Sequence, residues 1–246
     1  RLSAQTADDV RKFYEKINQY ESPKPCTWDD RAWTKKAIFA AGAHYNSDRD
    51  SMLSILQKHA AILDSSTFNL FPVETYGQAS FIITPQEQFN ESFNNGALLF
   101  DYIGEGISGF NINFDLQPPS AYENINRNPF IIANSSFVGD NFNFGSSNIA
   151  LTEKFVLIED IGAIGGLAST GIENYSYANP IYKLLLRNLF HHFTDQPFGY
   201  SLHQVFAEKL IPEAITHNDL ATNLALLTLH YEGDPALQLA GRYTVP

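Results

Sequence analysis

Short apolar segments alternate with amphipathic helical segments along this chain, and no other feature constrains its fold as strongly. The apolar segments are bounded by polar or glycine-containing stretches, which is typical of strands buried in a sheet. Parallel strands joined by crossover helices produce such an alternation, because each helix returns the chain to the same end of the sheet. We therefore predict an α/β fold with a mostly parallel sheet and helices on both of its faces.

The same pattern gives approximate boundaries for each element. The predicted strands cover residues 35–43, 69–76, 97–104, 128–136 and 161–169. The predicted helices cover residues 7–21, 51–63, 84–96, 152–158, 179–193, 200–210 and 219–229. The 84–96 helix has the clearest signals, since Thr84 can cap it and Gly96 can end it. Residues 44–50 are polar and are predicted to form a loop.

The composition narrows the class of protein. Hydrophobic residues make up 44% of the 246 residues, which excludes a disordered chain and suits one large domain. The formal charge is −11 and no lysine- and arginine-rich run occurs, so no nucleic-acid partner is expected. Cys26 is the single cysteine, which excludes an intrachain disulfide and a CxxC-type metal cluster. No apolar run reaches the length of about 18 residues that a membrane span needs.

Glycines and chemically useful side chains follow several of the predicted strands. Ligands of open α/β sheets gather at the carboxyl ends of the strands, so these positions are the first place to look for a site. The residues found there are His44, Gly104, Glu105, Gly106, Ser136, Ser169 and Thr170. We expect a binding or catalytic site at this edge, where glycine allows close backbone approach.

Two motifs at this edge resemble those of gingipain-type cysteine peptidases. These enzymes carry a tyrosine–glycine–histidine–glycine turn after an apolar strand, and here DYIGEG (101–106) occupies that turn. About 25 residues later they have a proline, an apolar strand and the nucleophilic cysteine, which PFIIANSSFVGDNF (129–142) resembles. The resemblance implies that Glu105 stands at the histidine position and Ser136 at the cysteine position.

Three further segments extend the resemblance over essentially the whole chain. They are residues 1–21, 151–170 and 233–239. The resemblance implies a caspase-like three-layer fold in which residues 1–246 form the larger subdomain, while the smaller N-terminal subdomain is absent. It also implies a secreted or cell-surface bacterial protein exported by type IX secretion. Because Arg1 runs almost directly into a helix pattern, we expect a processed piece of a longer precursor.

The two replaced positions argue against peptidase chemistry. A cysteine peptidase needs a thiolate and a base that holds its proton, and serine depends still more on a positioned base. A glutamate with a reference pKa of about 4.3 is a poor base for that purpose. We therefore predict a pseudo-peptidase whose cleft holds a peptide or protein ligand, or neighbouring domains of a larger precursor or assembly. The residues expected to line the cleft are Gly104, Gly106, Ser169, Thr170 and Tyr175.

Two alternatives stay open at this point. The first is an active peptidase or sortase-like transpeptidase in which Ser136 attacks, backbone amides near Gly106 and Ser136 form the oxyanion hole, and His44 could serve as the base. The second is a purely structural module of a large assembly.

A calcium site is the one cofactor that the sequence suggests. Asn46, Asp48 and Asp50 alternate as ligands do in calcium loops, but the glycine and the distant glutamate of an EF-hand are missing. We expect a solvated loop there, with calcium as the alternative and no other cofactor.

Overall fold

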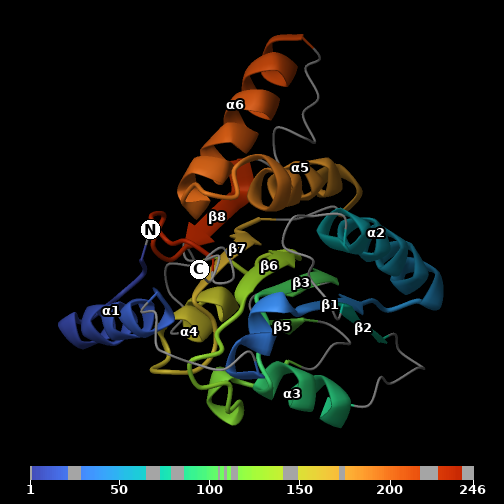
Figure 1. The fold of residues 1–246 in the computed structure, drawn as a ribbon. Coiled ribbons are helices and arrows are strands. Elements are labelled where there is room, and N and C mark those ends of the chain that lie inside the picture. The colour runs from blue at the N-terminus through green and yellow to red at the C-terminus, as the bar shows by residue number, and fades with distance from the viewer. Residues whose placement is uncertain are drawn as a thin grey trace.

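A sheet of six strands forms the centre of the computed structural model of this chain (Figure 1). The structure describes residues 2–21, 29–64, 73–78, 86–104, 106–107, 110–111, 116–140, 149–171, 175–216 and 227–239. Across the sheet the order is β2 (Val73–Gln78), β1 (Ala37–Gly42), β3 (Leu99–Gly104), β6 (Phe130–Asn134), β7 (Gly165–Ser169) and β8 (Leu229–Glu232). The first five run parallel, and β8 is antiparallel to β7. A separate ribbon joins β4 (Gly106–Ile107) to β5 (Phe110–Asn111).

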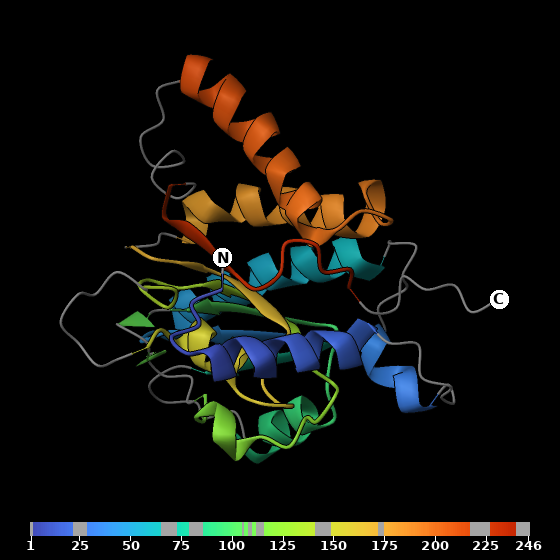
Figure 2. The ribbon, with the colours of Figure 1, turned by 90° about the vertical axis from the view of Figure 1, so that its left-hand side faces the viewer.

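Helices cover both faces of the sheet, which confirms the predicted three-layer arrangement (Figures 1 and 2). One face, called the upper face below, is covered by α2 (Asn46–Asp64), α5 (Tyr175–Arg187) and α6 (Phe198–Thr216). The opposite or lower face is covered by α1 (Ala7–Glu21), α3 (Gln86–Asn94) and α4 (Leu151–Leu157). Short helical turns complete the chain at η1 (Asp29–Lys35), η2 (Pro119–Ala121) and η3 (Asn188–His192). None of the helices in the described ranges is long and apolar enough to cross a membrane.

Burial on both faces explains why the strands are uninterrupted apolar runs. Every residue of β1, β6 and β7 is buried, so side chains pointing either way must be apolar or small. On the lower face five aromatic rings contact one another at centroid distances of 4.4 to 5.9 Å. They are Phe89, Phe93, Phe100, Tyr122 and Phe155. On the upper face Phe130 of β6 packs on Phe198 of α6 at 4.2 Å.

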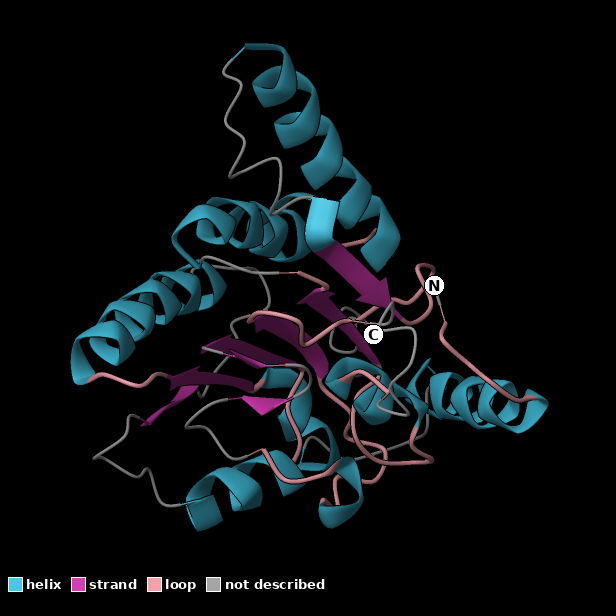
Figure 3. Cartoon of the chain, turned by 180° about the vertical axis from the view of Figure 1, so that it is seen from behind, coloured by secondary structure: helices cyan, strands magenta, loops and turns pink. Residues whose placement is uncertain are grey.

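The connections between strands change direction between β1 and β3. From β1 the chain passes through α2 to β2 on one side, whereas from β3 it continues to β6 on the other side (Figure 3). Such a topological switch point is where open α/β sheets form a ligand crevice, at the carboxyl ends of the two strands. Gly42 of β1 and Gly104 of β3 are paired at this place.

Most predicted elements are present, with boundaries that differ by a few residues. Gly96 has a φ of 82° and ends α3 as expected, while Thr84 and Pro85 lie outside the described residues. Helix α5 begins at Tyr175, four residues before the predicted start at residue 179, and carries Pro180 inside it.

The prediction of a loop over residues 44–50 was wrong. Helix α2 already begins at Asn46, and the Arg49 guanidinium bonds Asn46 at 3.4 Å and Asp50 at 2.6 Å. Asn46, Asp48 and Asp50 therefore lie on the first turns of a helix and do not form a calcium-type loop. Over the described ranges no group of three or more histidine, cysteine or carboxylate side chains is placed to hold a metal ion.

Two strand assignments also differ from prediction. Residues 161–164 form a turn, because Gly162 has a φ of 80° and exchanges hydrogen bonds with the Asn124 side chain. Leu229, predicted to end a helix, begins strand β8. Residues 219–226 of that predicted helix lie outside the described residues.

Candidate functional site

The carboxyl ends of β1, β3, β6 and β7 form one edge, called the ligand edge below. Its described residues include His44 after β1, Gly104 at the end of β3, Ser136 after β6 and Ser169 at the end of β7. His44 is exposed and Ser136 is half-buried. Glu105 lies outside the described residues, between β3 and β4. The fold thus brings the positions predicted from separate motifs to a common edge.

The turn that contains Ser136 is fixed to the segment that leaves β7. The Phe137 N–H donates to the Gly171 carbonyl at 2.9 Å, and the Gly139 N–H donates to the Ser169 carbonyl at 2.8 Å. Phe137 adopts a φ of 60°, a left-handed conformation that bulky residues rarely take. A Cβ on Gly139 would approach the Ala168 Cβ to 2.9 Å, so glycine allows the turn to lie against β7.

These bonds restrict what the turn can do chemically. An oxyanion hole needs backbone N–H groups that point at the reacting atom. Two N–H groups that follow Ser136, those of Phe137 and Gly139, are instead committed to carbonyls of the β7 exit. An oxyanion hole at Ser136 would have to be built from other amides.

Gly104 has a steric role at the end of β3. A Cβ at this position would run into the hydroxyl and ring of Tyr102. The Tyr102 ring lies on the lower face and can take this position only because residue 104 has no side chain.

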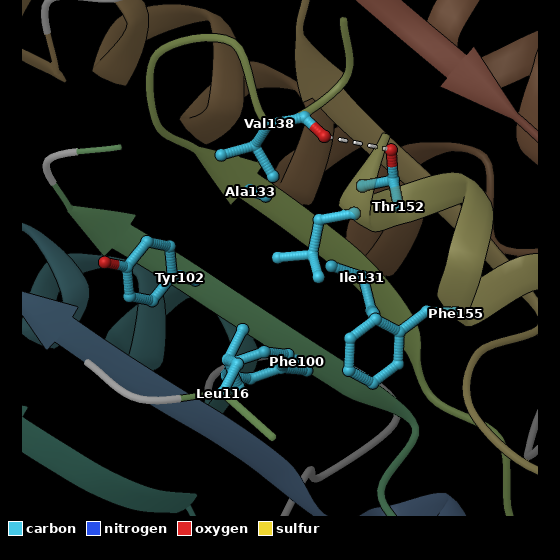
Figure 4. A pocket seen from close by; sticks show the side chains of 9 residues that line it. Phe100, Tyr102, Leu116, Ile131, Ala133, Val138, Thr152 and Phe155 are labelled. Atoms are coloured by element: carbon cyan, nitrogen blue, oxygen red, sulfur yellow. Dashed lines mark hydrogen bonds between the residues drawn. The ribbon is translucent and has the colours of Figure 1, made fainter. Parts of the chain in front are cut away.

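An apolar pocket lies on the lower face beneath the Ser136 turn (Figure 4). It is nearly filled by its own side chains, with a free volume of about 10 Å³. Its lining residues are Phe100, Tyr102, Leu116, Ile131, Ala133, Val138, Leu151, Thr152 and Phe155. The Thr152 hydroxyl donates to the Val138 carbonyl at 3.4 Å, so the pocket offers almost no polar group to a ligand.

The other residues predicted to line the cleft hold the local structure. The buried Ser169 hydroxyl bonds the backbone of Gly171, with its oxygen accepting the Gly171 N–H at 3.2 Å. The Thr170 hydroxyl donates to the Thr228 carbonyl at 3.1 Å. Tyr175 is the first residue of α5 and packs partly against the core. Gly106 begins β4.

Most histidines are placed away from Ser136. His59 is buried under the upper face, His191 bonds the Ile62 carbonyl at 2.7 Å, and His230 bonds Glu232 on β8. His192 belongs to η3 and His203 is exposed on α6. His217 lies outside the described residues. Of the described histidines, His44 alone follows a strand at the ligand edge.

A buried polar network lies behind the ligand edge on the upper face, and the sequence analysis did not predict it. His59 of α2 bonds the Asp101 carboxylate of β3 at 2.6 Å through Nδ1, and its Nε2 faces Oδ1 of Asn179 on α5 at 3.1 Å. Asp101 and His59 are at most 1% exposed. An aspartate inside the apolar run ALLFDYIG was the available signal, because a buried strand carries a carboxylate only when it is paired.

Asn134 and Ser135, which immediately precede Ser136, were also missed. Each is 1% exposed, and neither amide atom of Asn134 nor the Ser135 hydroxyl has a hydrogen-bond partner among the described residues. Native structures pair about nine-tenths or more of such atoms, so these side chains mark the end of β6 as unusual.

The sequence matches the family model described as Peptidase family C25 over residues 1–240. Among solved structures, the chain is similar to the Arg-specific cysteine proteinase gingipain R, with 17% identity, a TM-score of 0.75, and 97% of this chain matched to 54% of that one. It is also similar to a complex of Porphyromonas gingivalis RgpB pro- and mature domains, with 16% identity and a TM-score of 0.77 over 97% of this chain and 56% of that one. A structure described only as a protease matches at 13% identity and a TM-score of 0.74, over 97% and 55%. The chain spans about half the length of these proteins, and none of the curated proteins matches it.

Proposed function

Because the chain belongs to peptidase family C25, we propose that it is a non-proteolytic member that binds a peptide or a neighbouring protein domain at the ligand edge. The family and the caspase-like α/β fold are those that the sequence motifs predicted. Residues 1–246 would correspond to the larger subdomain of that fold.

The single observation that carries this proposal is the serine in the turn after β6. Ser136 stands where the motif expects the nucleophilic cysteine, and the motif after β3 has Glu105 where it expects histidine. A serine hydroxyl becomes nucleophilic only beside a base such as histidine held by a carboxylate. The described residues hold two histidine–carboxylate pairs. His59 with Asp101 lies on the upper face and contacts Asn179, and His230 with Glu232 lies on β8, where Glu232 also accepts a hydrogen bond from the Ser3 hydroxyl.

The contacts of the Ser136 turn support a binding role. Three contacts hold the turn in place: two backbone hydrogen bonds to the β7 exit and the close approach of Gly139 to Ala168. A rigid edge loses little conformational freedom when a ligand orders on it, which favours affinity. A protein that has lost its catalytic residues can still bind a ligand at the ligand edge.

The setting we propose is a secreted or cell-surface bacterial protein exported by type IX secretion, in which neighbouring domains contact this one. The complex of RgpB pro- and mature domains supplies a precedent for partners of that kind in a relative. The chain's match to about half of each relative's length also leaves room for such domains.

Activity assays on wild type and two variants test the proposal. Wild type and Ser136→Ala should both fail to cleave a panel of fluorogenic peptides, and a serine-reactive phosphonate should not label wild type. The double variant Ser136→Cys with Glu105→His restores a thiol and an imidazole at the two motif positions, so iodoacetamide labelling of this new cysteine at pH 6 should exceed that of Ser136→Cys alone. Phosphonate labelling of wild type that Ser136→Ala abolishes would overturn the proposal and support the serine hydrolase or transpeptidase instead.

A further inference from the structure

The end of β6 carries a buried amide that no described residue hydrogen-bonds. Asn134 is 1% exposed, and its Oδ1 and Nδ2 both lack a hydrogen-bond partner in the described part of the chain. The next residue, Ser135, is equally buried and its hydroxyl is likewise unpaired there. Both side chains directly precede Ser136 at the ligand edge.

Strand geometry places the Asn134 amide on the upper face. Ile131 and Ala133 line the apolar pocket on the lower face, so Phe130, Ile132 and Asn134 point the other way. Asn134 pairs with Ile103 of β3, two residues beyond Asp101 towards the ligand edge. The amide therefore lies between the His59–Asp101–Asn179 network and the edge.

The neighbouring strands do not offer the amide a partner. Ile103 is apolar, and Ser169, one residue beyond the Ala133–Ala168 pair, uses its hydroxyl for the backbone of Gly171. A buried amide is stable only when its donors and acceptor are satisfied. None of the described residues satisfies the Asn134 amide, and its position next to Ser136 makes the ligand edge the side from which a ligand group would reach it.

We propose that Asn134 is the specificity residue of the ligand edge and that it selects peptides carrying a carboxamide side chain, glutamine or asparagine. The proposal rests on the peptide-binding function proposed above and names its ligand class. A carboxamide presents one acceptor and one donor group side by side, which is the complement of the Asn134 amide.

Other ligand side chains satisfy the Asn134 amide only in part. A lysine or arginine side chain has donors but no acceptor, so Nδ2 would stay unpaired. A carboxylate has acceptors only, so Oδ1 would stay unpaired, and an aliphatic side chain leaves both unpaired. On this face the Asp101 carboxylate is bonded to His59 through Oδ2, while its Oδ1 has no hydrogen-bond partner among the described residues. Sites that hydrogen-bond a polar substrate group reject analogues lacking it strongly.

Peptide binding by the full chain tests the proposal directly. The probes are fluorescein-labelled, alanine-rich heptapeptides that differ only in the central residue: glutamine, asparagine, glutamate, arginine or leucine. Fluorescence polarisation should give at least tenfold tighter binding of the glutamine or asparagine peptide than of the other three. Mass spectrometry of the same samples records any cleavage.

Three variants separate recognition from a structural role of the amide. Asn134→Leu, similar in size, should bind the five peptides within about twofold of one another while its circular dichroism and melting temperature match or exceed those of wild type. Asn134→Asp keeps the acceptor and loses the donor, so its preference should change to the arginine peptide. The control Asn188→Leu changes an asparagine that is also 1% exposed but lies beyond the far end of α5, and it should keep the wild-type preference.

The possible results distinguish this inference from the proposed function. Equal affinity of wild type for all five peptides, or a preference that Asn134→Leu retains, overturns the role of Asn134 while the edge remains a binding site. Cleavage of a peptide overturns the non-proteolytic function but leaves an amide preference standing. Failure of every peptide to bind contradicts this inference and the peptide-binding form of the proposed function.

Discussion

At the scale of single residues, the chain concentrates polar groups in its interior behind the ligand edge. The Asp101 carboxylate accepts a hydrogen bond from Nδ1 of His59 at 2.6 Å, and the pair joins β3 to α2. Asn179 on α5 contacts the other ring nitrogen, so one imidazole connects three elements that are distant in sequence. These contacts of the His59 side chain fix the positions of α2 and α5 on the sheet.

Breaking this pair should cost much stability. His59→Leu leaves the Asp101 carboxylate buried without its partner, and we expect a loss of about 3–5 kcal/mol in the free energy of unfolding. The double variant His59→Leu with Asp101→Leu removes both polar groups and should recover most of that loss. Urea unfolding followed by circular dichroism measures both values. A loss below about 1 kcal/mol for His59→Leu would show that the pair does not hold α2 in place.

At the scale of secondary-structure elements, one lysine fixes helix α1 to the lower layer. Lys16 is 2% exposed, and its ammonium donates to the carbonyls of Val156 at 2.8 Å, Ile161 at 2.9 Å and Ala163 at 3.3 Å. The first of these carbonyls belongs to the last turn of α4, whose carbonyls have no partner within the helix. Burial lowers the pKa of Lys16 from its ordinary value of 10.5 to about 7.

This buried lysine should make stability depend on pH. Between pH 7 and pH 10.5 the unfolded chain holds a proton on Lys16 that the folded chain has largely released, since the folded pKa is about 7. Folding is therefore favoured as pH rises through this window, and the penalty for burying the charge is fully present below about pH 7. From pH 7 to pH 9 the gain should be roughly 2 kcal/mol.

The variant Lys16→Met isolates this contribution from the other titrating groups. It keeps the length of the side chain but cannot titrate, so its stability should lack the rise that wild type shows between pH 7 and pH 9. Urea unfolding at four pH values gives the difference between the two proteins. Parallel pH profiles would mean that Lys16 keeps its ordinary pKa in the folded protein.

At the scale of the whole molecule, the layers of the fold could be predicted from the sequence, but the contacts between the layers could not. Apolar runs and helical periodicity locate the parallel strands because those strands are buried on both faces. The short strand β8 was missed, since Leu229 follows a helical pattern and its strand conformation depends on pairing with β7. The partners of Asp101 and Lys16 could not be predicted either, because His59 and the carbonyls of Val156, Ile161 and Ala163 meet them only after folding. The candidate site was likewise proposed from motifs, whereas the Asn134 amide, which has no hydrogen-bond partner among the described residues, is a property of the packed edge.

The first described residues and the last strand are joined by a buried carboxylate, which should make the two ends of the fold stabilise each other. Glu232 of β8 is fully buried, accepts hydrogen bonds from the Ser3 N–H and, at 2.7 Å, from the Ser3 hydroxyl, and lies 3.2 Å from Nε2 of His230. Ser3→Ala removes one donor and should lower the free energy of unfolding by about 1–2 kcal/mol. Glu232→Ala should cost about 2–4 kcal/mol, because it leaves several donors and a cavity behind.

Glu159 provides a matched control for the Glu232→Ala prediction. The Glu159 side chain is half-exposed, and its ion pair with Lys12 is long, at 3.7 Å. Exposed ion pairs of this kind contribute little, so Glu159→Ala should change the free energy of unfolding by less than about 0.5 kcal/mol. If the two ends fold as one unit, the near-ultraviolet signal of the aromatic core and the far-ultraviolet signal of the helices should give coincident unfolding curves in wild type and in Glu232→Ala. An earlier, separate transition in Glu232→Ala would instead mean that β8 and the segment before α1 detach while the parallel strands stay folded.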